Sequence, residues 1–218
     1  MHRLPLLETL CLRGGVLQLE ERHRYRMLSS LNTLGLGASP ISRWLERHHL
    51  EEDEGVARLM ELCTSAVDSY RLRLSYDASS LLPLGCSPYI PRQVRWLQPI
   101  RLAEGFDYAL KSSNRVYFEQ AKQSLPPDVE PLYYRADGSL SDTSYTNLIL
   151  ELEEGLYTPE RPLLEGVQRA DLLARGLIQA HPLDLEDLYR ARSVRLINAM
   201  MPLEDCITLS SEQVLTPL

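Results

Sequence analysis

The hydrophobic period of the chain changes near residue 70, and this change restricts the fold more than any other feature. Three stretches before it carry apolar residues at helical spacing: Glu20 to Leu34, a segment opened by Ser39-Pro40, and about Glu52 to Val67. Tyr70 to Tyr76 then alternates strictly between apolar and polar residues, which is typical of a half-buried strand. Helical and strand patterns grouped in this way predict an α+β fold.

Strand-like segments open the chain and fill its second half. Leu6 to Leu12 and Val16 to Leu19 flank Gly14-Gly15, which predicts a hairpin. Prolines and a glycine between Pro83 and Pro91 indicate irregular chain. Further strands are expected at Val94–Ile100, Glu130–Arg135, Leu156–Thr158 and Val194–Ile197, and helices at Val116–Ser124 and Val167–Arg175. A hairpin turn at Asp137-Gly138 is expected to lead into a return strand at Thr146–Leu152, and a second turn is expected at Glu154-Gly155. The sequence therefore predicts two lobes, residues 1–102 and 103–218, with a cleft between them.

Composition excludes several classes of protein. A chain of 218 residues with 44% hydrophobic and 24% charged residues can bury an ordinary core. Its net charge of −7 argues against a nucleic-acid or anionic-membrane partner, and no apolar run approaches the ~20 residues of a membrane span. The N-terminal segment reaches an acidic residue at Glu8 and therefore lacks the long apolar core of a signal peptide. The four cysteines form no Cys-x-x-Cys pair, which favours reduced thiols and a cytoplasmic protein, and the histidines other than His23 show no metal-binding spacing.

Lys111 ends a strand-like run that begins at Phe106, and the helix-like run from Val116 follows it. A lysine at the end of a strand can be held in a pocket, which moves it towards its neutral, nucleophilic form. Taken alone, such a residue can also be an ordinary surface charge.

Seven short segments occur in one order along the chain. They are Glu8-Thr9, His23-x-x-Arg26-Met27, Leu110-Lys111-x-x-Asn114-Arg115, Asp137-Gly138-x-x-x-Asp142-Thr-Ser-x-x-Asn147, Leu156-Tyr-Thr-Pro159, Leu163-Leu164-x-Gly166-Val167-x-Arg169 and Asn198-Ala-Met-Met-Pro202. Together they resemble the class IV aminotransferase family, the fold-type IV enzymes that use pyridoxal 5′-phosphate (PLP). The resemblance implies a two-lobed α+β fold with a smaller N-terminal domain and a strand-rich C-terminal domain that binds PLP.

The resemblance assigns the first two cofactor contacts. It gives Lys111 the role of the lysine that forms the Schiff base with PLP and later moves the substrate Cα proton. Asp142 stands where the family usually has a glutamate that keeps the pyridine nitrogen protonated. Because aspartate is one methylene shorter, the ring must lie closer to it or a water must intervene. An aspartate at this position can alternatively cap its own turn.

The phosphate contacts come from three places. Gly166-Val167-Gln168 opens a helix, whose free N–H groups and positive dipole end suit a phosphate, and glycine allows close approach. The resemblance adds Arg26 as a fixed positive charge and Asn198-Ala199 as a further phosphate-contacting turn. The alternatives are a solvated helix arginine for Arg26 and a strand-end turn residue for Asn198.

The resemblance leaves three functions open. The two most diagnostic segments, around Lys111 and Asn198, are most similar to the branch of 4-amino-4-deoxychorismate lyase, which releases 4-aminobenzoate and pyruvate for folate synthesis. Thr9 resembles the threonine that assists proton transfer in that branch. The second function is a class IV aminotransferase for branched-chain or D-amino acids, and the third is a degenerate homologue without catalysis. A small amino substrate and a homodimer are implied by resemblance, and no metal is expected.

Overall fold

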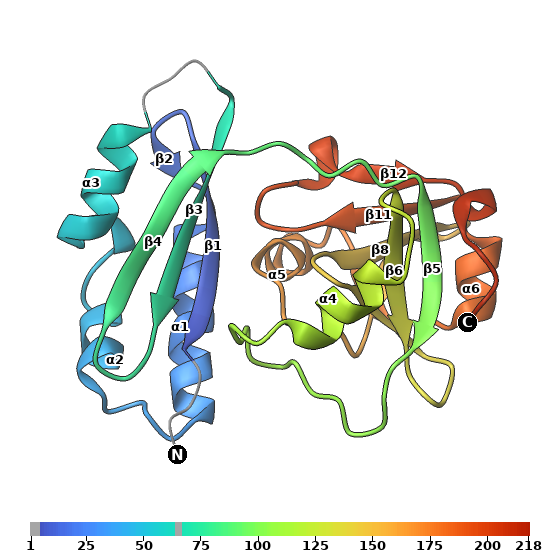
Figure 1. Cartoon of the computed structure of the whole chain (residues 1–218), viewed down its shortest axis with the longest axis horizontal. Coiled ribbons are helices and arrows are strands. Elements are labelled where there is room, and N and C mark those ends of the chain that lie inside the picture. Colours follow the sequence, from blue (N-terminus) through green and yellow to red (C-terminus); the bar gives the residue numbers. More distant parts are fainter. Residues whose placement is uncertain (1–4, 64–66) are drawn as a thin grey trace. The chain divides into compact units, whose positions relative to one another are not determined.

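The computed structural model describes residues 5–63 and 67–218. The chain forms two compact units, Met1–Ile90 with Leu110–Ser113, and Pro91–Ala109 with Asn114–Leu218. The α+β class is confirmed, and each unit has its own sheets and its own core (Figure 1). The predicted division after residue 102 stays a prediction. Among the described residues, no helix has the length and apolar character needed to span a bilayer.

The N-terminal unit is built on a four-stranded antiparallel sheet in the order β2-β1-β3-β4. The strands are β1 (Leu6–Arg13), β2 (Val16–Leu17), β3 (Ser69–Tyr76) and β4 (Leu81–Pro88). Gly14 and Gly15 both have positive φ, which the tight turn between β1 and β2 requires, so the predicted hairpin is confirmed.

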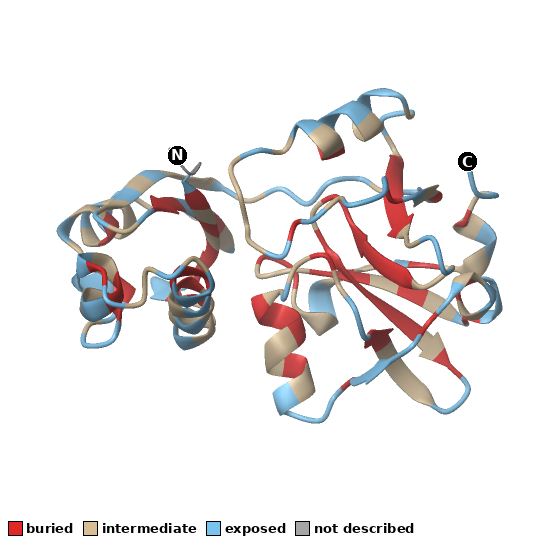
Figure 2. Ribbon diagram, turned by 90° about the horizontal axis from the view of Figure 1, so that it is seen from below, coloured by how far each residue is buried: buried red, intermediate tan, exposed pale blue. Residues whose placement is uncertain are grey.

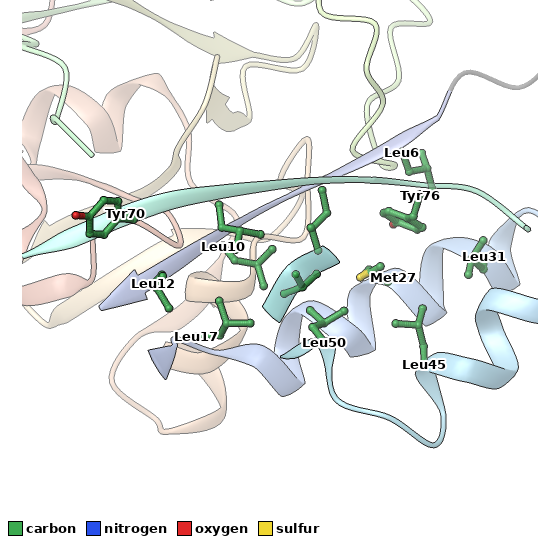
Figure 3. Packing of buried hydrophobic residues seen from close by; sticks show 13 residues of the cluster. Leu6, Leu10, Leu12, Leu17, Met27, Leu31, Leu45, Leu50, Tyr70 and Tyr76 are labelled. Atoms are coloured by element: carbon green, nitrogen blue, oxygen red, sulfur yellow. The ribbon is translucent and has the colours of Figure 1, made fainter. Parts of the chain in front are cut away.

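Helices cover one face of this sheet, and the core of the unit lies beneath them (Figure 3). They are α1 (Glu20–Thr33), α2 (Pro40–Leu45), the 3₁₀ turn η1 (Leu50–Glu52) and α3 (Glu54–Leu62). Met27 and Leu31 of α1 are fully buried against Leu10 and Tyr76 of the strands. All three predicted helices are present. The third ends at Leu62, and residues 64–66 of its predicted range lie outside the described residues.

The segment predicted to be irregular between Pro83 and Pro91 is instead largely strand β4, so that prediction is wrong. β4 is the edge strand of the sheet, where a proline costs no ladder hydrogen bond on the open side. The register shifts between Arg73 and Leu74, opposite Gly85, whose φ is +148°. The expectation of reduced thiols is also wrong for one pair, because Cys63 and Cys86 form a disulfide, while Cys11 and Cys206 are free.

The C-terminal unit contains two sheets. A three-stranded sheet has the order β5-β6-β7, with β5 (Trp96–Arg101) parallel to β6 (Val129–Tyr134) and β6 antiparallel to β7 (Leu140–Thr143). A five-stranded sheet has the order β10-β9-β8-β11-β12. Its strands are β8 (Asn147–Leu152), β9 (Gly155–Pro159), β10 (Gln179–His181), β11 (Ser193–Ile197) and β12 (Ile207–Leu209).

Three α-helices accompany these sheets: α4 (Val116–Gln123), α5 (Val167–Ala174) and α6 (Leu185–Arg190). The 3₁₀ turns η2 (Leu203–Asp205) and η3 (Ser211–Gln213) follow near the C-terminus. Central strand β8 is buried on both faces, because Leu148 and Leu150 enter one apolar cluster while Ile149 enters another with Leu172 of α5. Figure 2 shows buried residues of this unit on its strands and also on a helix, and α5 is buried at Val167, Gln168, Arg169 and Leu172.

Two further predictions need correction. The run Phe106–Lys111 is not a strand; Gly105 has φ +72°, and the Asp107 side chain accepts the Ala109 N–H, which is turn chemistry. The strand that returns from the Asp137-Gly138 turn is β7, whereas the predicted return strand is β8 and pairs with β9 and β11. The helices α4 and α5 and the strands β5, β6, β9 and β11 are confirmed within a few residues at each end.

Candidate active site

The backbone around Lys111 is bound to the edge of strand β1. The Leu7 N–H donates to the Lys111 carbonyl at 2.8 Å, Leu6 and Ser112 form an antiparallel bridge, and the Ser113 N–H donates to the Pro5 carbonyl at 3.2 Å. Lys111 is half-buried. The lysine is therefore fixed on the N-terminal unit by its main chain, although it does not end a strand of its own.

Lys111 is one of only two lysines in the chain. The other, Lys122, lies in the last turn of α4, where its ammonium donates to the carbonyls of Pro126, Pro127 and Val129. An ammonium held by three carbonyls is unsuited to act as a nucleophilic amine. Of the two lysines, Lys111 is therefore the candidate for a nucleophilic amine.

Glu8 on β1 and two residues of α1, His23 and Arg26, form a buried polar cluster. Arg26 donates from Nε to Glu8 Oε1 at 2.8 Å and from Nη2 to Oε2 at 2.6 Å. His23 Nδ1 lies 2.7 Å from Glu8 Oε2. Glu8 and His23 have no solvent exposure, and the Arg26 side chain is mostly buried. Arg26 is thus an oriented arginine and not a solvated one.

The charges of this cluster set its protonation. Burial alone raises the pKa of Glu8, but the Arg26 guanidinium and the His23 hydrogen bond outweigh burial and hold that pKa well below its usual range. Burial lowers the pKa of His23, and the positive charges of Arg26 and Lys111 lower it further, against the opposing effect of Glu8. His23 is therefore neutral, and since a carboxylate only accepts, its proton is on Nδ1.

Thr9 follows Glu8 on β1 and is half-buried. Because successive strand residues point to opposite faces, Thr9 lies on the face of the sheet that does not carry the Glu8 cluster. Its partner in the register is Arg73 of β3. The hydroxyl is thus placed on the sheet face that the helices leave uncovered.

Asp142 ends β7 in the C-terminal unit and is 4% exposed. Oδ1 accepts from Asn147 Nδ2 at 2.9 Å, and Oδ2 accepts the backbone N–H groups of Leu163 at 2.8 Å and Leu164 at 3.0 Å. Burial raises the pKa of Asp142 to about 6, although these donors and the more distant charge of Arg169 oppose it. In the described part of the chain no lysine or arginine forms an ion pair with this carboxylate.

Asn147 links Asp142 to the start of helix α5. Its Nδ2 also donates to the Leu164 carbonyl at 3.0 Å, and its Oδ1 lies against Gly166. A Cβ on Gly166 would come within 1.8 Å of that oxygen. Glycine is therefore required here by close side-chain approach rather than by backbone conformation, since its φ is −71°.

Helix α5 begins at Gly166 with no side-chain cap on its first N–H groups. Arg169, one turn into the helix, is buried and anchors this start by donating to the Pro159 carbonyl at 2.9 Å and to Glu165 Oε2 at 2.7 Å. Val167 and Gln168 are buried beside it. The uncapped helix start suits an anion.

Asn198 follows β11 and is tied into its own turn. Its Oδ1 accepts the Met200 N–H at 2.8 Å, and its Nδ2 donates to the Tyr145 carbonyl at 3.4 Å. Asn198 and Met201 also pair through their backbones, with Ala199 between them. The side chain thus orders the turn, which leaves the main chain around Ala199 as the part that can face a ligand.

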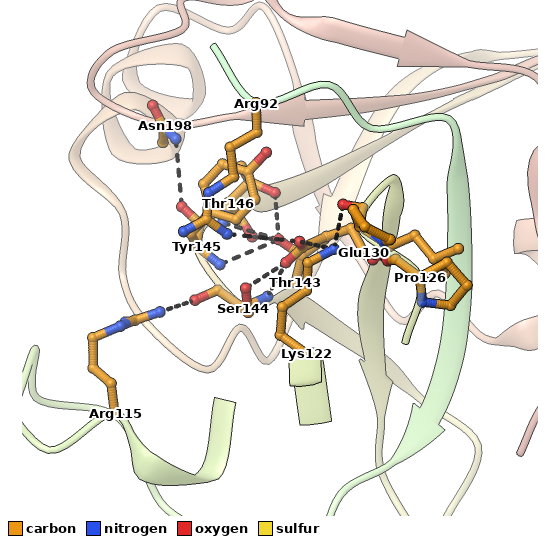
Figure 4. A network of polar contacts seen from close by, with 12 residues as sticks. Arg92, Arg115, Lys122, Pro126, Glu130, Thr143, Ser144, Tyr145, Thr146 and Asn198 are labelled. Atoms are coloured by element: carbon orange, nitrogen blue, oxygen red, sulfur yellow. Dashed lines mark hydrogen bonds and ion pairs between the residues drawn. The ribbon is translucent and has the colours of Figure 1, made fainter. Parts of the chain in front are cut away.

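The turn between β7 and β8 is held from several elements (Figure 4). Arg115 Nη2 donates to the Ser144 carbonyl, and the Arg92 guanidinium lies 4.4 Å from the centre of the Tyr145 ring. Buried Glu130 accepts from both the Ser144 N–H and its hydroxyl. This turn separates Asp142 from Asn147, so the network fixes both ends of the Asp142–Asn147 pair.

The side chains present fit PLP in chemical type. The cofactor requires an amine, a carboxylate for its pyridinium and donors for its phosphate, and the chain has Lys111, Asp142, Arg26 and the start of α5. Asp142 is a buried carboxylate without a cation of its own, as a pyridinium partner should be. Lys111 and Arg26 belong to the N-terminal unit, and Asp142, Gly166 and Asn198 to the C-terminal unit.

Sequence reasoning missed four buried residues that shape these groups: Glu8, His23 and Asn147, which it used only as pattern positions, and Glu130. Asn147 could have been found, because an amide five residues after a buried carboxylate is a candidate partner. Glu130 lies 14 residues from Ser144, and no local pattern connects them. Among the described residues, no group of histidine, cysteine, aspartate and glutamate side chains is arranged to hold a metal ion.

Comparison with known proteins places the chain in a family. Residues 6–204 match the profile of the family described as amino-transferase class IV. A protein of Haemophilus influenzae strain Rd without a functional name is 29% identical over 90% of this chain and 97% of its own. A crystal structure from Haemophilus somnus 129PT, provisionally named a 4-amino-4-deoxychorismate lyase, is 30% identical with a TM-score of 0.76, covering 93% of this chain and all of that one.

A second crystal structure, from Mesorhizobium loti and provisionally named an amino-acid aminotransferase, is 23% identical with a TM-score of 0.72. It covers 97% of this chain and 99% of its own, and at this identity it supports the fold alone. The chain belongs to the class IV aminotransferase family, whose members are PLP-dependent enzymes.

Proposed function

We propose that the chain is a lyase of the 4-amino-4-deoxychorismate lyase type, which forms 4-aminobenzoate and pyruvate for folate synthesis. The similarity to the Haemophilus somnus protein, which extends over that protein's whole length, supports this choice within the family. The motif around Lys111, with Asn114 and Arg115, points the same way.

The buried carboxylate of Asp142 carries the cofactor part of the proposal. Its pKa is raised to about 6 because three neutral donors do not compensate its burial. A protonated pyridine beside it would supply the missing cation, and each would stabilise the charged form of the other. Asp142 thereby serves as the pyridinium partner despite being one methylene shorter than glutamate.

We assign the remaining cofactor contacts as follows. Lys111 provides the amine, Arg26 is oriented by Glu8 for the phosphate, and the start of α5 at Gly166, Val167 and Gln168 offers N–H groups. The turn at Asn198-Ala199 adds a further main-chain contact. When bound, PLP supplies an electron sink for a carbanion at the substrate carbon next to nitrogen.

The reaction needs one proton removed and one delivered. Lys111 Nζ takes the proton from the ring carbon that bears the amino group, the ring ether bond breaks, and the ring becomes aromatic. The leaving enolpyruvyl group gains a proton at its methylene carbon and departs as pyruvate. Thr9, whose hydroxyl is on the uncovered sheet face of the N-terminal unit, is the proposed relay for that proton.

Covalent trapping tests the cofactor site. Borohydride reduction of the yellow protein should attach PLP to the peptide that contains Lys111, as read by mass spectrometry. Lys111→Ala should abolish the attachment, while Lys122→Ala, at the only other lysine, should keep it. A colourless protein that takes up no PLP would instead favour the degenerate homologue.

Amino transfer is the competing activity, and the family includes both. Pyruvate release from 4-amino-4-deoxychorismate should exceed amino transfer from a panel of L- and D-amino acids to 2-oxo acids. Transfer from a branched-chain or D-amino acid without pyruvate release would overturn the lyase assignment and leave the cofactor site intact. A homodimer, a cytoplasmic location and the domain division after residue 102 are further parts of the proposal, and light scattering of the purified protein tests the first.

A further inference from the structure

The Glu8 cluster holds the guanidinium of Arg26 in a defined orientation. Both hydrogen bonds to Glu8 leave one edge of the guanidinium, from Nε and Nη2, and bind the two carboxylate oxygens separately. Such a bidentate pair determines the plane of the group as well as its position. Arg26 is thereby presented in one orientation before any ligand arrives.

His23 in turn fixes Glu8. Its Nδ1 binds Oε2, the same oxygen that accepts Arg26 Nη2. His23 and Arg26 are three residues apart on α1 and therefore share a face of the helix. Glu8 is thus held by two residues of one helix through three hydrogen bonds, and rotation of its carboxylate would break all three.

This arrangement is a poor way to stabilise a core. Replacing a buried ion pair with apolar side chains is often neutral or stabilising. In addition, His23 Nε2 is buried without a hydrogen-bond partner among the described residues, which carries a desolvation cost. The cluster therefore requires a purpose other than packing.

We propose that His23 and Glu8 are positioning residues that hold Arg26 in the orientation that receives the phosphate of the cofactor. This inference rests on the proposed function, because it takes Arg26 as a phosphate contact. Pre-orientation removes the ordering cost that a free arginine would incur on binding. It also offsets the partial neutralisation of Arg26 by Glu8, which would otherwise weaken attraction for an anion.

His23 is the residue to change, since its replacement leaves the charges of Glu8 and Arg26 in place. In His23→Asn an amide N–H can occupy about the position of Nδ1, whereas in His23→Gln the amide lies one bond further out. Both variants are neutral and polar, so they form a matched pair. His23→Leu replaces the Gln variant if that protein does not fold.

The measurement is binding of PLP and of pyridoxal, which has the same ring and aldehyde but no phosphate, to the protein freed of cofactor. We expect His23→Gln to weaken PLP binding about tenfold with less than a twofold change for pyridoxal, and His23→Asn to stay near the wild type. Arg26→Met should remove the preference for PLP, and adding His23→Gln to it should have no further effect on that preference. His49→Gln, at an exposed histidine paired with Glu20 in the same unit, is the control.

Equal weakening of PLP and pyridoxal would overturn the inference, because it would show a general disturbance of the unit. An unchanged preference for PLP over pyridoxal in folded His23→Gln would also overturn the inference. The same holds if His23→Gln still weakens PLP binding about tenfold in the Arg26→Met background. Failure of the proposed function is separate: the wild type would then bind neither compound at Lys111.

Discussion

Each unit buries a carboxylate that the proposal links to the cofactor, and the two carboxylates have opposite surroundings. Glu8 in the N-terminal unit is paired with an arginine and a histidine, and its pKa is held well below the usual range. Asp142 in the C-terminal unit accepts, among the described residues, from an amide and two backbone N–H groups, and burial raises its pKa to about 6.

The difference shows which of the two carboxylates has a positively charged partner within its own unit. The negative charge of Glu8 is balanced by Arg26, which Glu8 also orients. The negative charge of Asp142 has no ion-pair partner among the described residues. A cation from outside the chain would therefore stabilise the ionised form of Asp142 more than that of Glu8. Glu130 is intermediate, since burial raises its pKa while Arg92 and Lys122 lie 3.9 Å away. A buried carboxylate alone is thus weak evidence for a cofactor site, and the partners of the carboxylate determine whether it is a candidate.

The largest expected effect comes from breaking the completed pair. Glu8→Gln leaves Arg26 mostly buried without its counter-charge and should destabilise the N-terminal unit by about 3–5 kcal/mol. Urea unfolding is followed by the fluorescence of Trp44, with Trp96 changed to Phe so that only this unit reports. Glu52→Gln, which breaks the exposed pair with His48, should have a far smaller effect. Equal losses in the two variants would mean that Glu8 is no more important than a surface charge.

The next effect is the pH dependence of stability, which has opposite signs for Asp142 and Glu8. The pKa of Asp142 rises from an ordinary 3.8 to about 6 on folding, so its ionisation destabilises the folded protein by about 3 kcal/mol. That cost is absent below pH 3.8 and complete above pH 6. Without cofactor, the protein should therefore lose stability relative to Asp142→Asn as pH rises through this window, read from Trp96 in the C-terminal unit with Trp44 changed to Phe in both proteins.

Bound PLP sharpens this test, because a pyridinium beside Asp142 stabilises the carboxylate. The loss between pH 4 and 6 should then disappear for the wild type, while Asp142→Asn should bind PLP weakly. A pH dependence that is the same with and without PLP would argue that the pyridine does not face Asp142. Glu8 contributes in the other direction, since its stabilisation is present above pH 4.5 and lost as pH falls.

Much of this fold follows from local pattern. The 3.6-residue period of α1, the Gly14-Gly15 turn and the alternation of β3 each specify their element without long-range information. Strand β4 was missed because prolines oppose a strand in general, and their tolerance at an edge depends on which strand becomes the edge. The segment before Lys111 looks apolar like a strand, but it has no neighbour with which to pair over Phe106–Leu110.

The cofactor residues were proposed from ordered motifs, yet the partners that determine their chemistry were not. Glu8 and Arg26 are 18 residues apart, and the backbone donors to Asp142 come from 21 and 22 residues further along the chain. Whether a carboxylate is neutralised is a property of these contacts, so the sequence could locate Asp142 but could not give the direction of its pKa.

The smallest effect tests how the C-terminal carboxylate is held. Gly166→Ala places a Cβ 1.8 Å from Asn147 Oδ1, so Asn147 must move and its hydrogen bond to Asp142 is strained or lost. We expect a loss of about 1–2 kcal/mol in unfolding free energy and weaker PLP binding. Gly176→Ala is the matched control on the far end of α5, since it meets nothing within 4 Å but has φ +67°, which costs about 1–2 kcal/mol by backbone strain.

The two glycine variants should therefore lose similar stability but differ in PLP affinity, because only one disturbs Asp142. Asn147→Ala removes both the obstructing oxygen and the bond, so Gly166→Ala should add nothing to it. Additive losses in that double variant would show that Gly166 acts through the helix start instead of through Asn147. In that case the uncapped N–H groups of α5, and not the orientation of Asp142, would limit how the C-terminal unit holds the cofactor.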